Sequence, residues 1–129
     1  MSKEDSFRAW DKVLKEMKYW SLEDIWSSEL MPEFSEYIIM QYTNIKDRDL
    51  KKIFHHDIVK VYGHSKYDPD KIVHDLGYVF WDERELTWIV KIPLDGGAEF
   101  EKLSKFYSLP DYIEVIGNLY ENPELLEVN

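Results

Sequence analysis

The stretch from Ile72 to Leu94 constrains the fold more than any other part of the chain. Aromatic and β-branched residues alternate on both sides of a polar connection, Asp82 to Glu85, which has the length of a hairpin loop. The pattern predicts two antiparallel strands. Because so apolar a hairpin cannot bury its own surface, other elements must pack on it. The residues that we expect at or near the core are Val59, Tyr78, Phe80, Trp88, Val90, Val115 and Leu119.

Further strand-like segments lie on both sides of this hairpin. They are Phe7–Trp10, Met17–Trp20, Ile38–Tyr42, Ile53–Tyr62 and Tyr112–Tyr120. Helix is expected only in short pieces near residues 22–30, 98–106 and 122–126. The pattern therefore predicts a mainly β fold with minor α content. We expect residues 109–126 to close the fold as a structural element and not to form a free acidic tail.

Length and composition limit the class of protein. With 129 residues the chain is long enough for one domain with a true core, and we expect a single domain over residues 1–129. The absence of cysteine excludes disulfides, thiol nucleophiles and thiolate zinc sites, which fits a reducing cytoplasm. No apolar run approaches the roughly 18 residues of a membrane span, and the N-terminus has no apolar signal region. We expect a cytoplasmic protein with no membrane partner.

The charge of the chain disfavours nucleic acid as a partner. The formal net charge is −10, whereas proteins that bind nucleic acid usually present a basic patch to the phosphates. Basic residues cluster only at Lys46, Arg48, Lys51 and Lys52. That cluster is typical of a solvated loop, but it leaves binding of nucleic acid open as an alternative.

Three separated stretches together resemble one known family. They are FRAWDKVLKEMKYW, MQYTNIKDRDLKKIFHHDIVKVYG and LPDYIEVIGNLYENPELLE. In this order and spacing they resemble the YopX family of small phage and prophage proteins of low-GC Gram-positive bacteria. The resemblance implies an SH3-like, partly open β-barrel core and a phage or prophage origin. It brings no known activity or catalytic residue to carry over.

The chain departs from the family pattern at two glycines. The family commonly has a tight Asn-Gly turn followed by Tyr-Glu-Gly-Asp, whereas this chain has Asp49-Leu50 and then Phe54-His55-His56-Asp57. Glycine is common at such positions because it adopts a positive φ without steric cost. Leu50 and His56 are therefore the two places where we expect unusual turn geometry.

The histidines and acids offer candidates for chemistry. A metal site would need three or four converging ligands, and a set made of His56, Asp57 and His64 is conceivable. Adjacent His55 and His56 would point to opposite faces of a strand, so they could not act together there without a bulge. Surface histidines, and an Asp57 that bonds turn amides, are the favoured interpretation. We assign no catalytic, metal or cofactor residue and no cofactor.

The five tryptophans exceed the need of a small core. Trp26, in a polar stretch, is the one that we expect at a protein interface. The leading hypothesis is a non-enzymatic accessory protein that binds an unidentified host or phage protein and also self-associates. The alternatives are a nucleic-acid-binding SH3-like barrel and a small metal-dependent hydrolase.

Overall fold

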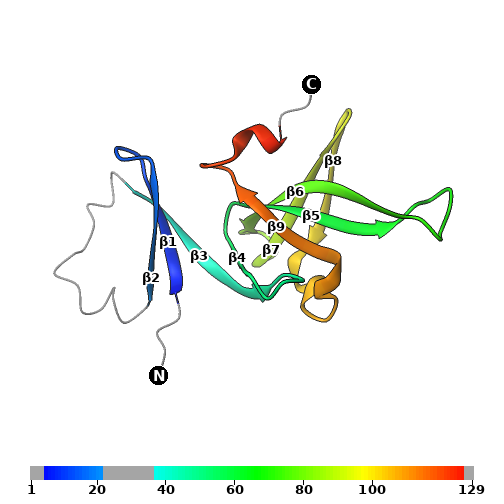
Figure 1. The fold of residues 1–129 in the computed structure, drawn as a ribbon, viewed down its shortest axis with the longest axis horizontal. Helices are drawn as coiled ribbons and strands as arrows, with labels where there is room; N and C mark the ends of the chain where they lie inside the picture. The colour runs from blue at the N-terminus through cyan, green and yellow to red at the C-terminus, as the bar shows by residue number, and fades with distance from the viewer. Residues whose placement is uncertain (1–4, 22–36, 127–129) are drawn as a thin grey trace. The chain divides into compact units, whose positions relative to one another are not determined.

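The computed structural model describes residues 5–21 and 37–126, which belong to two compact units, residues 1–42 and 43–129. Each unit is described by itself, and Figure 1 gives the element labels. The described strands are β1 (Asp5–Asp11), β2 (Glu16–Ser21), β3 (Tyr37–Lys46), β4 (Lys52–Phe54), β5 (Asp57–His64), β6 (Ile72–Asp82), β7 (Thr87–Leu94), β8 (Gly97–Lys102) and β9 (Ile113–Asn118). The described helical pieces are 3-10 turns, namely η2 (Leu103–Tyr107), η3 (Pro110–Tyr112) and η4 (Pro123–Leu126).

The mainly β fold class is confirmed. The strands form two antiparallel sheets, with orders β2-β1-β3-β4 and β8-β7-β6-β5-β9. The described strands form two separate sheets that do not close into a barrel. None of the short helical pieces in the described ranges has the length or the apolar character to cross a bilayer.

The first unit is built on β1. This strand pairs with β2 on one side, where Trp10 lies opposite Met17, and with the start of β3 on the other, where Ala9 lies opposite Ile39. The predicted strands at Phe7–Trp10 and Met17–Trp20 are confirmed as a hairpin. The helix expected near residues 22–30 and the interface residue Trp26 lie outside the described residues.

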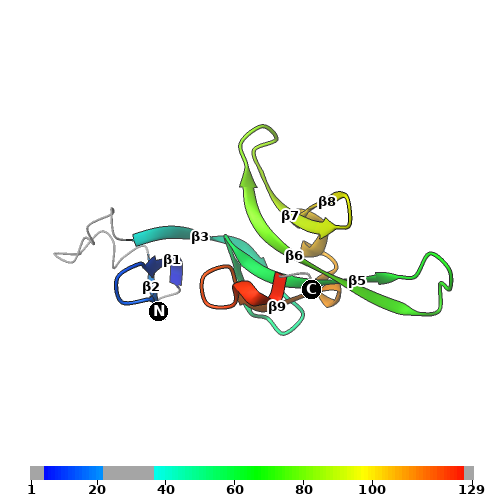
Figure 2. The same cartoon turned by 90° about the horizontal axis from the view of Figure 1, so that it is seen from above.

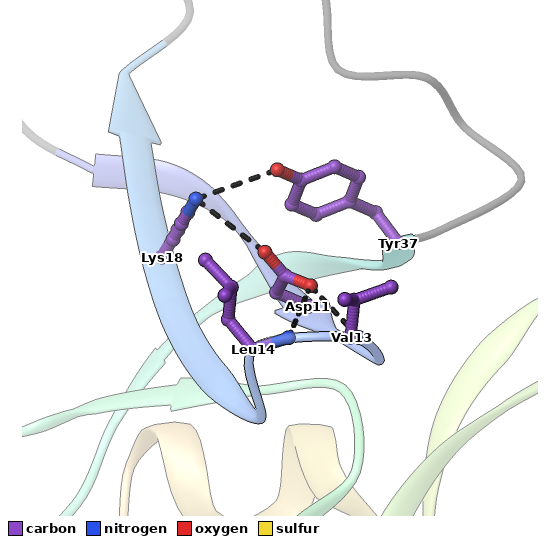
Figure 3. A network of polar contacts seen from close by, with 5 residues as sticks. All are labelled: Asp11, Val13, Leu14, Lys18 and Tyr37. Atoms are coloured by element: carbon purple, nitrogen blue, oxygen red, sulfur yellow. Dashed lines mark hydrogen bonds and ion pairs between the residues drawn. The ribbon is translucent and has the colours of Figure 1, made fainter.

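A carboxylate organises the turn of this first hairpin (Figure 3). Oδ1 of Asp11 accepts the backbone N–H groups of Val13 at 2.9 Å and Leu14 at 3.0 Å. The Lys18 ammonium lies 3.5 Å from Oδ2 of Asp11 and donates to the Tyr37 hydroxyl at 3.4 Å. The Leu14 amide is the largest cause that lowers the pKa of Asp11, and the bond to Tyr37 is the largest cause that raises the pKa of Lys18.

The second unit contains the predicted hairpin at Ile72–Leu94. Its strands β6 and β7 pair from Tyr78 opposite Lys91 to Asp82 opposite Thr87, and Figure 2 shows how strongly β6 curves along its length. The connecting turn lies one residue later than expected, at residues 83–86. Because the strands are long and apolar, they form the middle of the five-stranded sheet, between β5 and β8.

The register of this hairpin overturns part of the expected core. Val79 lies opposite Val90, and both are fully buried, so Val79 and not its neighbours faces the core. Tyr78 and Phe80 were expected there with Val90, but they lie on the opposite face of the sheet and are half-buried. Both faces of β6 carry large apolar residues, so alternation alone does not say which face is covered.

The core of the second unit lies on one face of the five-stranded sheet, where residues of β4 and η2 pack against it. Trp88 and Val115 pack against its edge, as expected, and Leu119 is half-buried beyond the end of β9. The fully or nearly buried residues of this hydrophobic core are Ile53, Val59, Val79, Val90, Ile92, Leu103, Phe106 and Ile113.

Residues 98–106 do not form the expected helix. The first part of this segment, β8, pairs with β7, and only the part from Leu103 turns helical, which lets Leu103 and Phe106 enter the core. Pairing with β7 satisfies the backbone of β8 more simply than a short helix would. The helical turn expected at 122–126 is present as η4.

The C-terminal segment is part of the fold, as expected. β9 pairs with β5 through a register shift between Ile58 and Val59, so the predicted strand at Tyr112–Tyr120 lies in the sheet. The Asn118 carboxamide oxygen accepts the N–H groups of Tyr120 and Glu121 and turns the chain after β9. A Cβ on Gly117 would lie 2.6 Å from Oδ1 of Asn122, so this turn needs glycine at that position.

The two expected turn positions do adopt a positive φ without glycine. Leu50 has a φ of 63° and His56 has a φ of 70°. A side chain with a Cβ costs roughly 1–2 kcal/mol in this left-handed conformation. The departures from the family pattern are therefore places where the backbone is strained.

Replacing Leu50 by glycine should raise the free energy of unfolding by about 0.5–1 kcal/mol, because relief of the strain exceeds the extra entropy of glycine in the unfolded chain. The Leu50 side chain is 77% exposed, so its loss removes little packing. The matched control is Leu50→Ala, which keeps a Cβ and should show no gain. Chemical denaturation of the three proteins measures the difference, and equal gains for both variants would contradict this explanation.

Replacing Asp11 by asparagine should make stability less dependent on pH in acid. The folded-state pKa of Asp11 is lowered, so its contribution to stability is fully present above its ordinary pKa and is lost as the pH falls through the folded value. Urea unfolding from neutral pH to about pH 3 should show the wild-type curve falling below about pH 4 and meeting the flatter Asp11→Asn curve. Asp95→Asn, which changes an exposed carboxylate in the turn after β7, is the control and should follow the wild type.

Candidate functional site

The turn between β4 and β5 holds the sequence-predicted candidates His55, His56 and Asp57. It is fixed by the neighbouring strands. The N–H of His56 donates to the carbonyl of Val79 in β6 at 2.7 Å, and the carbonyl of His56 accepts the N–H of Leu119 at 3.0 Å. The positive φ of His56 allows both bonds to form at one residue. The two imidazoles are therefore held on a rigid support.

These imidazoles continue a series of aromatic rings, which we name the ring row: Trp81, Trp88, His55, His56 and Tyr120. Trp81 and Trp88 face each other across the β6–β7 hairpin with ring centroids 5.1 Å apart, and His55 lies 5.2 Å from Trp88. The ring centroids of His55 and His56 are 3.8 Å apart, and the two planes are tilted by 34°.

Tyr120, just after β9, ends the ring row. Its ring centroid lies 5.5 Å from that of His56, and its hydroxyl lies within hydrogen-bond distance of His56 Nδ1, at 2.9 Å. This contact limits how far the His56 ring can rotate. The ring row thus draws its members from β6, β7, the β4–β5 turn and the end of β9, which are all within the second unit.

The ring row is accessible at one end and flanked by acids. Trp81 is 39% exposed, and the other four rings are half-buried. In sequence, Glu83 follows Trp81 in the hairpin turn and Glu121 follows Tyr120, where its carboxylate accepts the carboxamide N–H of Asn118 at 2.9 Å. Flat rings with nearby carboxylates suit apolar or planar cationic groups of a partner, because ring faces attract cations and carboxylates pair with them.

Asp57 has a structural role in this arrangement. Its side chain is only 1% exposed, and Oδ2 accepts the N–H of Phe54 at 2.7 Å. The favoured interpretation, an aspartate that bonds a turn amide, is confirmed. The carboxylate is turned into the protein and closes the turn that carries the histidines.

The conceivable metal set of His56, Asp57 and His64 is wrong. Asp57 begins β5 and His64 ends it, so an eight-residue strand, on the order of 20 Å, separates His56 from His64. His64 contacts the carbonyl of Pro69 through Nδ1 at 2.9 Å. Across residues 5–21 and 37–126, no three histidine, aspartate or glutamate side chains come close enough to hold a metal ion.

Sequence reasoning missed that Trp81, Trp88 and Tyr120 belong with the histidines. Counting outward from the observed turn at residues 83–86 places Trp81 opposite Trp88, whereas the turn expected at Asp82 to Glu85 would have placed it opposite Leu86. The contact of this pair with His55 depends on how the β4–β5 turn docks on β6, and that docking is a long-range feature. Trp26, the expected interface residue, is outside the described part of the chain.

Comparison with known proteins gives a family and a fold. The model of the family described as YopX protein matches residues 23–127. The crystal structure of protein EF1440 from Enterococcus faecalis is similar, with 24% sequence identity and a TM-score of 0.53 over 98% of this chain and 100% of that chain. At this identity the likeness shows the fold alone. No curated protein matches the sequence.

Replacing Asp57 by alanine should lower the free energy of unfolding by about 1–3 kcal/mol, because the amide of Phe54 would lose this buried acceptor. Asp57→Asn is the matched variant. It keeps an oxygen that can accept the same bond, so its loss should be clearly smaller. Thermal and urea unfolding of both variants measure this, and a full loss in Asp57→Asn would show that the charge, and not the turn bond, matters.

Proposed function

This chain belongs to the YopX family, and we propose that it is a phage- or prophage-encoded accessory protein that acts by binding another protein through the ring row. The observation that carries the proposal is the continuous contact of five rings from Trp81 to Tyr120 on a rigid support. Tryptophan and tyrosine supply a large share of the binding energy in protein interfaces. Their rings lose little conformational entropy on binding when neighbouring rings already hold them.

The charge of the protein indicates what kind of partner fits. The chain carries a net charge of −10, and acidic residues adjoin Trp81 and Tyr120 in sequence. A positively charged segment of a host or phage protein would find complementary charge there and flat rings on which arginine or proline side chains can lie. In this proposal the protein acts in the cytoplasm of the bacterial host and catalyses no reaction.

The positions and contacts of Asp57 and His64 also support a binding role over a hydrolytic one. Asp57 belongs to the conceivable metal set, and its carboxylate bonds a backbone amide inside the protein. His64 is at the far end of β5 from His56. The side chains that remain together in the ring row are mostly aromatic, and such surfaces recognise partners.

Site-specific photo-crosslinking tests the proposal. A photoreactive amino acid at position 81 should capture a partner in phage-infected or prophage-induced cells, whereas the same group at position 67 should not. Tyr67 is 98% exposed and lies in the β5–β6 connection, outside the ring row. The captured protein is then purified and its affinity for the wild type is measured.

Trp81→Ser should weaken that affinity by at least about tenfold, a loss of roughly 1.4 kcal/mol, which is typical of a residue that matters in an interface. Tyr67→Ser is the matched control and should leave the affinity unchanged. Equal weakening by both variants, or equal capture at positions 67 and 81, would count against binding through the ring row. Circular dichroism of each variant checks that the fold is kept.

A further inference from the structure

The face of the five-stranded sheet opposite the core has a different chemistry from the rest of this acidic protein. Strand register places a group of residues on it, since directly opposed residues share a face. Lys60 lies opposite Leu76, Tyr62 opposite His74, and Lys91 opposite both Tyr78 and Phe100. We name this surface the aromatic face; its members are Lys60, Tyr62, His74, Leu76, Tyr78, Phe80, Lys91 and Phe100.

The rings on the aromatic face contact one another along and across the strands. Tyr62 and His74 have centroids 5.9 Å apart, and Tyr78 and Phe80 have centroids 6.2 Å apart. Phe80 in β6 meets Phe100 in β8 at 6.4 Å, across the intervening β7. The Phe100 side chain is 59% exposed. His74 is also exposed, whereas Tyr62, Tyr78 and Phe80 are half-buried, and Ile58 and Ile89 on the same face are buried. The accessible rings therefore lie toward the two ends of this face, on strands about 4.8 Å from their neighbours.

Cations lie directly beside these rings. The Lys91 ammonium is 6.0 Å from the Phe100 ring centroid, and the Arg48 guanidinium is 4.9 Å from that of Tyr62. Among the described residues, Lys60, Lys91 and Arg48 form no ion pair. Their charges are therefore available to an anionic ligand.

Three acids near this face bond within the protein, and one of them, Glu85, lies beside a cation. Glu114, opposite Lys60, accepts the hydroxyl of Tyr62 at 3.0 Å, and Asp82 accepts the N–H of Arg84 at 2.9 Å. Glu85 lies 3.9 Å from Lys102, a further lysine at this edge. The net charge of −10 therefore conceals one surface where cations and rings occur together.

We infer that the aromatic face binds single-stranded nucleic acid. Unpaired bases can stack on exposed rings, which is worth about 1–3 kcal/mol per base, while lysine and arginine neutralise the phosphates between them. Duplex fits poorly, because its paired bases are stacked inside and do not offer their faces to a sheet. The small number of cations, set against the acidic remainder, makes this binding weak and strongly sensitive to salt.

Fluorescence anisotropy with a labelled oligo(dT) of about 20 nucleotides tests the inference, starting at about 20 mM salt. Saturable binding is expected, and it should weaken as salt is raised. Phe100→Ala should lose stacking and weaken binding by about tenfold or more. Lys91→Gln should weaken binding and also reduce its dependence on salt, because one phosphate contact is lost. Phe100 is exposed, so its variant should fold, which a thermal melt checks.

Two control variants separate this surface from the rest of the protein. Tyr107→Ala removes a 75% exposed aromatic side chain in η2, and Lys66→Gln removes an exposed lysine in the β5–β6 connection. Neither should change the affinity. The inference is overturned by an absence of binding at low salt, by equal losses in the control variants, or by binding of a duplex of the same length as tightly as the single strand.

Discussion

The buried carboxylate of Asp47 is the contact on which most of the second unit depends. Oδ1 accepts the N–H groups of Asp49 and Lys51, and Oδ2 accepts the N–H of Val115 in β9, each at 2.9 Å. One side chain thereby shapes the turn before β4 and holds the strand at the edge of the sheet. β4 leads into the turn that carries His55 and His56, and β9 leads into Tyr120. The two segments that Asp47 holds therefore both supply rings to the ring row. A buried charge is tolerated here because several amides share it.

The positions of most strands along the chain were predictable from sequence, because local alternation around turns carries that information. The hairpin at Ile72–Leu94 is an example, since it depends on neighbours in the chain. The strained positions Leu50 and His56 were expected because glycines of the family pattern are missing there. The covered face of β6 was not predictable by alternation, since Tyr78 and Val79 are both apolar and pairing across the sheet decides between them. The role of Asp47 was hidden for a similar reason, as its partner Val115 lies far along the chain.

The five-stranded sheet separates two kinds of surface by the alternation of its strands. The pairing that sends Trp81 and Trp88 toward the histidine turn sends Phe80 and Lys91 to the other side. An insertion of one residue in β6 would exchange these sets and disrupt both surfaces together with the core. Register thus decides which side chains share each face of the sheet, and it explains why neither the ring row nor the aromatic face could be assigned from composition or net charge.

The edge strand β8 has a consequence for how copies of the protein behave in concentrated solution. Among the described strands it pairs only with β7, and its residues Glu99 and Glu101 alternate with Phe100. If two copies aligned edge to edge, these carboxylates would be brought close together, so like charge opposes the addition of a strand. Acidification neutralises carboxylates and removes that barrier while Phe100 stays exposed. Acid therefore favours edge-to-edge pairing of β8 between copies, which neutral solution opposes.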